Sequence, residues 1–172
     1  MRLGPPPIVF LTVPPVTDSA SATYRIEKTR LAIAIRLRGG SVIQGFVFAQ
    51  ATPYGGREEP ADVLNGSDPF VPIETRGGGT LLVSKDHVLE AIPDAPAEID
   101  EMRRLTARSA EIELTLEDGT RRRGVVLIEM PHERPRVLDF LNSATQRFLT
   151  LYAGGTATLI NRQAVACVRP LD

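Results

Sequence analysis

Two polar side chains, Asp139 and Asn142, stand three positions apart and could present a carboxylate and an amide to one ligand. The same pair recurs at Asp62 and Asn65. The alternative is a helical turn or cap, in which both side chains bond nearby backbone amides while the intervening apolar residues enter the core. A shared fold would explain the recurrence as well as a shared site would. Both interpretations stay open, and we favour the structural one.

The densest basic feature is the run Arg121-Arg122-Arg123, and Arg136 follows it. On a β-strand, residues 121 and 123 face one way and residue 122 the other, so this run alone cannot form a continuous patch of three arginines. We favour a charged hairpin edge that discourages aberrant strand pairing over contact with an anion or a nucleic acid. The candidate contact residues so far are Arg121, Arg123, Arg136, Asp139 and Asn142.

Residues suited to catalysis or metal binding are sparse. The two histidines, His87 and His132, have no cysteine or acidic neighbours at zinc-ligand spacing and no evident nucleophile partner. The glycines at 77–79 are explained by a hairpin turn, and no helix follows them to complete a phosphate-binding loop. We therefore expect no enzymatic activity, no metal and no cofactor.

Charge and cysteine content restrict the function further. Twenty basic and 21 acidic residues leave a net charge of −1, which argues against binding nucleic acid by broad phosphate neutralisation. Aromatic side chains for base stacking are scarce, and the chain has no tryptophan. The single cysteine, Cys167, cannot form an internal disulfide and sits in an apolar run, so we expect a buried structural thiol.

The first 28 residues are rich in proline, and five prolines bracket one apolar stretch from Ile8 to Val13. This stretch is too short for a signal-peptide core or a membrane span, so we expect a cytoplasmic protein that does not bind a membrane. The segment is interpreted either as a disordered extension or as a strand that adds to an exposed sheet edge.

An internal repeat defines the organisation of the chain. Residues 30–40 match residues 109–119, 79 positions later (40 and 119), and Leu82-Val83 matches Leu159-Ile160. Each copy has about 65 residues, near the lower limit for a self-sufficient core, so we expect the halves to pack on each other or on partner chains. The expected units are an extension over 1–28, repeats over 29–93 and 109–172, and a helical connector over 94–108.

Both repeats have the pattern of short strands. Apolar residues alternate with others at Ile33 and Ile35, and again at Ile112 and Leu114, as in half-buried strands. Turns such as Asp118-Gly119 join paired strands. A glycine inside each second strand, at positions 45 and 124, predicts a bulge or a close backbone approach. Five short strands per repeat predict a mostly β chain made of two small, strongly bent antiparallel barrels.

Two other kinds of segment complete the sequence pattern. A helix is predicted over 94–105, with Asp94 as N-cap and with Ile99, Met102 and Leu105 on one face that docks on a barrel. The longer excursions at 50–68 and 131–146 are where we would look for a site, because such loops in a compact barrel are usually functional or disordered.

The stretch Ile112-Glu-Leu-Thr-Leu-Glu-Asp-Gly-Thr-Arg-Arg-Arg-Gly-Val-Val126 resembles the first motif of the Sm-like small barrels, the superfamily of Sm, LSm and Hfq proteins. Residues 159–165 stand where that superfamily has its second motif, with Asn161 and Arg162 in place of its Arg-Gly pair. The resemblance covers both halves and implies two tandem five-stranded Sm-like, or SH3-like, barrels joined by a short helix. It adds Asn161 and Arg162 to the candidate contact residues.

A closer likeness involves the segment Arg136-Val-Leu-Asp139-Phe-Leu-Asn142 followed by Phe148-Leu-Thr-Leu151. It resembles an uncharacterised bacterial family of small Sm-like domains marked by Arg-x-x-Asp-Phe-Leu-Asn and then Phe-Leu-x-Leu. This likeness bears on the fold and implies little about activity.

Small barrels leave edge strands open, and pairing of such edges builds rings or dimers. We therefore expect a non-enzymatic scaffold or adaptor that forms a homo-oligomer or binds a protein partner. The alternatives are a nucleic-acid binder that uses the arginines of the second repeat, and a small-ligand sensor that uses the loop with Asp139 and Asn142.

Overall fold

The structure, a computed structural model, describes residues 28–52, 56–97, 99, 101–129 and 136–171. The first repeat contains β1 (Lys28–Leu37), β2 (Val42–Gln50), α1 (Pro60–Asn65), β3 (Phe70–Thr75), β4 (Thr80–Ser84), the 3₁₀ turn η1 (Lys85–His87) and β5 (Val88–Pro93). Helix α2 (Glu101–Thr106) precedes the second repeat. The second repeat contains β6 (Arg108–Leu116), β7 (Arg121–Ile128), α3 (Val137–Ser143), β8 (Phe148–Ala153), β9 (Thr156–Asn161), the 3₁₀ turn η2 (Arg162–Ala164) and β10 (Val165–Pro170). The chain is mostly β, as the sequence predicts, and the expected proline-rich extension falls almost wholly outside the described residues.

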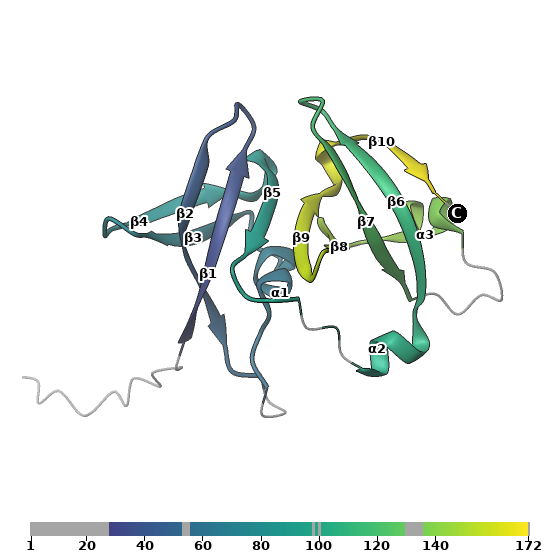
Figure 1. Ribbon diagram of the computed structural model, residues 1–172. Helices are drawn as coiled ribbons and strands as arrows, with labels where there is room; N and C mark the ends of the chain where they lie inside the picture. Colours follow the sequence, from purple (N-terminus) through teal and green to yellow (C-terminus); the bar gives the residue numbers. More distant parts are fainter. Residues whose placement is uncertain (1–27, 53–55, 98, 100, 130–135, 172) are drawn as a thin grey trace, which may run out of the picture.

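All ten strands belong to one antiparallel sheet in the order β10-β6-β7-β8-β9-β5-β1-β2-β3-β4. The two repeats have the same internal order, β5-β1-β2-β3-β4 and β10-β6-β7-β8-β9. Figure 1 shows them side by side, with β3 and β4 running across β1 and β2. Strands β5 and β9 pair where the repeats meet, so the halves pack on each other as expected. The sequence does not predict that both repeats join into a single sheet.

The apolar alternation seen in the sequence produces two cores. Ile33 and Ile35 of β1 are buried in one cluster, and Ile112 and Leu114 of β6 are buried in the other. Successive side chains of a strand point to opposite faces, so each period-two run lines one core.

The glycines inside the second strands permit close crossing of the backbone. A Cβ atom at Gly45 would lie 2.3 Å from the carbonyl oxygen of Glu74, and one at Gly124 would lie 2.6 Å from that of Tyr152. Any side chain would therefore push β3 away from β2, or β8 away from β7. The prediction of a close backbone approach at both glycines is confirmed.

The connector differs from its prediction, because its helix begins at Glu101 and not after Asp94. The backbone amides of Asp94 and Ala97 donate instead to the carbonyl oxygens of Ala32 and Gly155, each at 3.0 Å, which ties this stretch to β1 and to the turn between β8 and β9. Leu105 is 78 % exposed, so the predicted docking of its face on a barrel is wrong at that residue. No helix in the described part of the chain is long and apolar enough to cross a membrane.

The expectation of a buried thiol at Cys167 is also wrong, because Cys167 is exposed. It lies on β10, which stands at one end of the described sheet, so one side of this strand is left without a described neighbour. Val165 and Val168 are partly buried, whereas Ala166 and Cys167 face outward. An apolar run on an edge strand therefore does not imply burial.

Candidate functional site: the contact between the repeats

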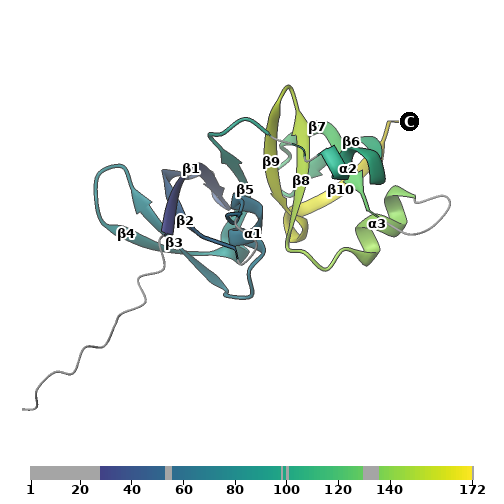
Figure 2. The ribbon, with the colours of Figure 1, turned by 90° about the horizontal axis from the view of Figure 1, so that it is seen from below.

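The repeats meet along β5 of the first and β9 of the second, where Glu90 lies opposite Ile160 and Ala91 lies opposite Leu159. Figure 2 shows the two repeats on either side of this junction when the molecule is seen from below. Most of the buried polar side chains and several ion pairs of the described structure gather here. We therefore treat the junction as the candidate site.

Apolar side chains cross the junction in both directions. Phe148 and Leu159 of the second repeat belong to the core cluster of the first, in which Leu64, Val88 and Ala91 are buried. Leu89 of the first repeat belongs in turn to the core cluster of the second. Each core is therefore completed by residues of the other repeat.

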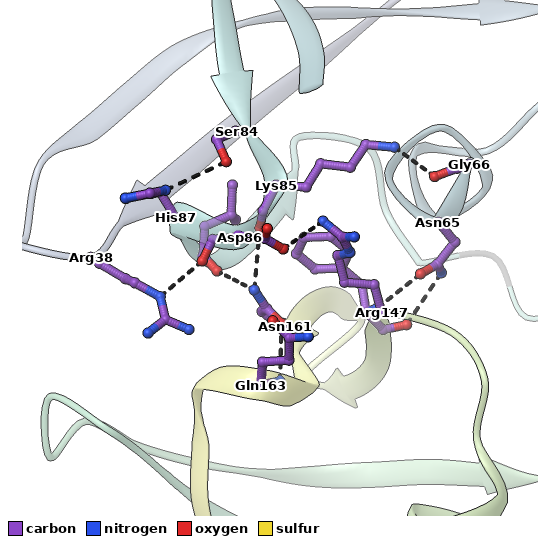
Figure 3. A network of polar contacts seen from close by, with 12 residues as sticks. Arg38, Asn65, Gly66, Ser84, Lys85, Asp86, His87, Arg147, Asn161 and Gln163 are labelled. Carbon is purple, nitrogen blue, oxygen red and sulfur yellow. Dashed lines mark hydrogen bonds and ion pairs between the residues drawn. The ribbon is translucent and has the colours of Figure 1, made fainter. Parts of the chain in front are cut away.

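Asn65, at the end of α1, clamps the backbone of the second repeat. Its Nδ2 donates to the carbonyl oxygen of Phe148 at 3.2 Å, and its Oδ1 accepts from the backbone amide of Phe148 at 2.8 Å. Figure 3 shows Asn65 directed across the junction. A carboxamide carries an NH₂ donor group and a carbonyl acceptor at its tip, which match the carbonyl and the N–H of one backbone residue.

Asn161 is fully buried and reaches across the junction in the opposite direction. Its Nδ2 donates to the carbonyl oxygens of Val88 at 2.8 Å and of Lys85 at 3.2 Å, while its Oδ1 accepts from the backbone amide of Gln163 at 3.0 Å. The two carbonyl groups belong to the first residue of η1 and to the first residue of β5, so Asn161 ties both elements of the first repeat to β9. Loss of such bonds costs more than their net contribution, because unsatisfied buried groups remain.

Lys85 of η1 holds α1 in position under the junction (Figure 3). Its buried Nζ donates to the carbonyl oxygens of Gly66 at 2.9 Å and of Val63 at 3.2 Å, near the C-terminal end of α1. Burial lowers the pKa of the Lys85 ammonium, and the positive charge of Arg147 lowers it further. The helix that carries Asn65 is thus anchored by an internal lysine.

The carboxylate of Glu90 accepts hydrogen bonds from arginines of both repeats. Arg36 donates to it at 2.8 Å, and Arg122 of the second repeat donates through two nitrogens at 2.7 and 2.9 Å. Burial alone would raise the pKa of the Glu90 carboxyl, but the hydrogen bonds and charges of Arg122 and Arg36 outweigh it and hold the pKa below its usual value. The buried acid therefore stays charged.

The turn between β6 and β7 joins the same set of charges. Asp118 accepts from the backbone amide of Thr120 and from Arg36, which together lower the pKa of its carboxyl to about 2. Two further ion pairs cross the junction, Arg38 with Glu117 at 2.7 Å and Arg147 with Asp86 at 2.8 Å. Both repeats thus contribute acids and bases to one network.

The residues singled out from the sequence lie on three separate elements. Arg121 and Arg123 are exposed on β7, and Arg122 turns away from them to Glu90, so the expected division of the arginine run between two faces is confirmed. Arg136 precedes α3, and Asp139 and Asn142 lie within α3 with exposed side chains.

Asn161 and Arg162, the two candidates from the second motif, lie at the junction. Asn161 is buried there, and Arg162 begins η2, partly buried, with its backbone amide donating to the carbonyl oxygen of Arg147 at 2.9 Å. The structure thus brings this pair to the junction and places α3 and the exposed arginines elsewhere in the second repeat.

The structural interpretation of the recurring Asp/Asn pair is supported in the first repeat. Asp62 accepts from the backbone amide of Glu59 at 2.9 Å, within a capping box at the start of α1. Asn65, in contrast, bonds the backbone of the other repeat and not that of nearby residues.

Sequence reasoning missed the main residues of the junction, which are Asn65, Lys85, Glu90 and Phe148. One signal was present at Glu90, a single acid inside the apolar strand Val88–Pro93. A second was the alignment of Asn65 with Asn142, because a phenylalanine follows at nearly the same spacing in both repeats, Phe70 in the first and Phe148 in the second.

The residues of this junction hold the two repeats together, because its polar groups bond one another and its apolar groups complete two cores. Within the described residues, no three histidine, cysteine or acidic side chains come together in a way that could hold a metal ion. No protein-family model, curated protein or solved structure matches this chain.

Proposed function

We propose that this protein is a non-enzymatic assembly module, a scaffold or adaptor built from two Sm-like barrels, whose copies join end to end through their sheet edges. The resemblance of both repeats to Sm-like domains supports the barrels, and the shared strand order is in keeping with it. The single observation that carries the proposal is the pairing of β9 with β5 inside the chain.

That pairing joins the fourth strand of one repeat to the fifth strand of the other. The remaining fourth strand is β4 and the remaining fifth strand is β10, and these two stand at the ends of the described sheet. The two open edges are therefore equivalent to the two strands that pair at the junction: β4 corresponds to β9, and β10 corresponds to β5. Open backbone groups on an edge strand are a template for pairing with another chain.

The exposure of equivalent residues supports the same conclusion. Phe148 is fully buried and Leu159 is 1 % exposed at the junction, whereas their counterparts in the first repeat, Phe70 and Leu82, are 53 % and 73 % exposed. Burial of a large apolar side chain contributes about 1.5–3 kcal/mol. A second copy that covers the β4 edge would therefore gain what the second repeat already gains inside the chain.

The internal register predicts the register between copies. Cys167 occupies the position of Glu90, and Val83 that of Ile160, each 77 residues apart (90 and 167, 83 and 160). Cys167 of one copy would then lie opposite Val83 of the next, and Val168 opposite Leu82. Such a contact joins two different surfaces, so it closes into a ring or extends into a filament.

Two variants that each block one edge test this arrangement. Leu82→Arg places a charge on the β4 edge, and Cys167→Arg places one on the β10 edge; both positions are exposed, so both variants are expected to fold. We expect the wild-type chain to form a multimer in light scattering and each variant alone to stay monomeric. A mixture of the two should form a 1:1 complex, because one intact β4 edge then meets one intact β10 edge.

Circular dichroism provides the folding control for both variants. A wild-type chain that stays monomeric across concentrations would overturn the proposal, and so would two folded variants that each still assemble. A chain that assembles only after removal of residues 1–27 would also contradict it, because the N-terminal segment would then be the natural occupant of the edge.

The nucleic-acid alternative has less support. Arg123 donates to Glu111 at 2.8 Å, and Arg169 pairs with Glu113 at 3.8 Å, so carboxylates are interleaved with the arginines of the second repeat. Absorbance of the purified particle at protein and nucleic-acid wavelengths distinguishes the two functions. Copurifying RNA that is lost in Arg121→Ala and Arg123→Ala variants would favour nucleic-acid binding.

A further inference from the structure

We infer that Asn142 is the clamp by which one copy of this chain holds the next, with its side-chain amide bound to the backbone of Phe70 of the second copy. This inference rests on the proposed function, and it names the residue that does for the contact between copies what Asn65 does inside the chain.

The equivalence of the two asparagines is fixed by local structure. Asn65 is the last residue of α1, and Asn142 lies in the last turn of α3, 77 positions later (65 and 142). Phe148 begins β8 and lies opposite Asn161, as Phe70 begins β3 and lies opposite Ser84. The pair formed by Asn65 and Phe148 therefore corresponds to Asn142 and Phe70.

Asn142 and Phe70 lie too far apart in the repeat order to form this pair within one chain. Asn142 belongs to the repeat whose open edge is β10, and Phe70 belongs to the repeat whose open edge is β4. Both are exposed. A second copy that docks β4 on β10 brings the two together in the arrangement that Asn65 and Phe148 already have.

In the second repeat, the apolar residues equivalent to those that contact Phe148 are incompletely buried. Leu64, Val88 and Ala91, which share a cluster with Phe148, are fully buried. Their counterparts in the second repeat are Leu141, Val165 and Val168, and all three are only partly buried. The ring of Phe70 from a second copy would cover them as Phe148 covers the first set.

The chemistry of Asn142 explains why an amide stands at this position. The backbone of Phe70 offers one N–H donor and one carbonyl acceptor, and a carboxamide binds both at once. An aspartate at this position would lack the donor, and alanine would lack both groups. The recurring asparagine is thus a docking residue for a strand, and a small ligand is not needed to explain it.

The experiment uses the two edge-blocked full-length chains described above. In their 1:1 complex, the Leu82→Arg chain supplies the β10 edge and its Asn142, while the Cys167→Arg chain supplies the β4 edge and its Phe70. Asn142→Ala in the Leu82→Arg chain should weaken the complex about tenfold or more, since two hydrogen bonds are lost. Asn142→Asp should weaken it as well, because the donor to the carbonyl of Phe70 is removed.

The matched control is the same substitution in the other chain. Asn142→Ala in the Cys167→Arg chain lies beside the blocked edge, so the dissociation constant should not change. Gln44→Ala, which removes a carboxamide from the exposed face of β2, should also leave it unchanged. Dissociation constants from sedimentation equilibrium measure all of these.

The outcomes separate the inference from the function on which it rests. Absence of any 1:1 complex between the parent variants would overturn the proposed edge pairing. A complex that forms but is equally tight with and without Asn142 in the Leu82→Arg chain would overturn the clamp alone. An equal loss of affinity from Asn142→Ala in either chain would also overturn it, because the effect would then be a general loss of folding.

Discussion

Arg38 and Glu117 occupy the same position in the two repeats, and they bind each other, with Nη1 of Arg38 2.7 Å from Oε2 of Glu117. Their separation of 79 residues (38 and 117) is the spacing that relates β1 to β6. In an end-to-end assembly, Glu117 of one copy would therefore approach Arg38 of the next. Opposite charges at equivalent positions favour repeated addition of copies, whereas like charges would oppose it.

Removal of the charge on Glu90 should loosen the junction inside the chain. Glu90→Gln leaves Arg36 and Arg122 beside a neutral, buried partner, and loss of one member of a buried ion pair costs on the order of 3 kcal/mol. We expect urea denaturation to show a reduced free energy of unfolding of this size. Glu129→Gln, which breaks an exposed pair with Arg103, is the control and should cost about 1 kcal/mol or less. Equal effects of the two substitutions would contradict a special role for Glu90.

The same carboxylate predicts how stability depends on pH. The pKa of the Glu90 carboxyl is lower in the folded chain than its ordinary value, so the unfolded chain binds more protons as the solution is acidified. The contribution of Glu90 should be complete above the unfolded pKa and decline as pH falls through the folded pKa. Asp118, with a pKa of about 2, extends the decline to lower pH.

This pH dependence is measured by urea unfolding of the wild-type chain and of Glu90→Gln from neutral pH to about pH 3, because the lowered pKa of the Glu90 carboxyl places its titration at acidic pH. The difference in unfolding free energy between the two proteins should stay constant at neutral pH and shrink below the unfolded pKa. Parallel curves over the whole range would show that Glu90 has the same pKa in both states.

Asn65→Ala should affect stability and Asn142→Ala should not, although the two residues are equivalent. The first substitution leaves the buried backbone groups of Phe148 unsatisfied and should cost about 2–3 kcal/mol of unfolding free energy. The second removes an exposed side chain and should change it by about 0.5 kcal/mol or less. Both are compared in the monomeric Leu82→Arg chain by urea denaturation. A comparable loss in both would mean that Asn142 already has a structural partner within its own chain.

The sequence contained enough information for the strands and for their duplication. Alternating apolar residues, as at Ile112 and Leu114, fix which side of a strand is buried, and the close approach at Gly45 follows from the absence of a side chain. These are local properties, so a single repeat is sufficient to predict them. The start of the connector helix was misplaced because the amides of Asp94 and Ala97 bond to distant carbonyls, which local capping rules do not register.

The junction was not predictable in the same way, because its residues are related only through tertiary contacts. Asn65 carries no local sign that it bonds Phe148, 83 positions away. Cys167 has the apolar neighbours of a buried residue, yet its strand lies at the end of the described sheet. What the repeat does provide is an equivalent position in the other repeat for a residue of the junction, as Asn142 is for Asn65.

Cys167 supplies a native reporter for assembly. Its thiol is exposed in the single chain and would lie opposite Val83 of a second copy, so assembly should slow its reaction with a thiol reagent. For the wild-type chain, the rate constant at fixed reagent concentration should fall as protein concentration rises. For Leu82→Arg, whose β4 edge is blocked, it should stay at the value of the dilute wild type.

Addition of the Cys167→Arg chain should then protect the thiol of the Leu82→Arg chain, because it offers an intact β4 edge and has no cysteine of its own. A rate that does not depend on protein concentration, in a wild-type sample shown by light scattering to be multimeric, would place the contact between copies away from β10.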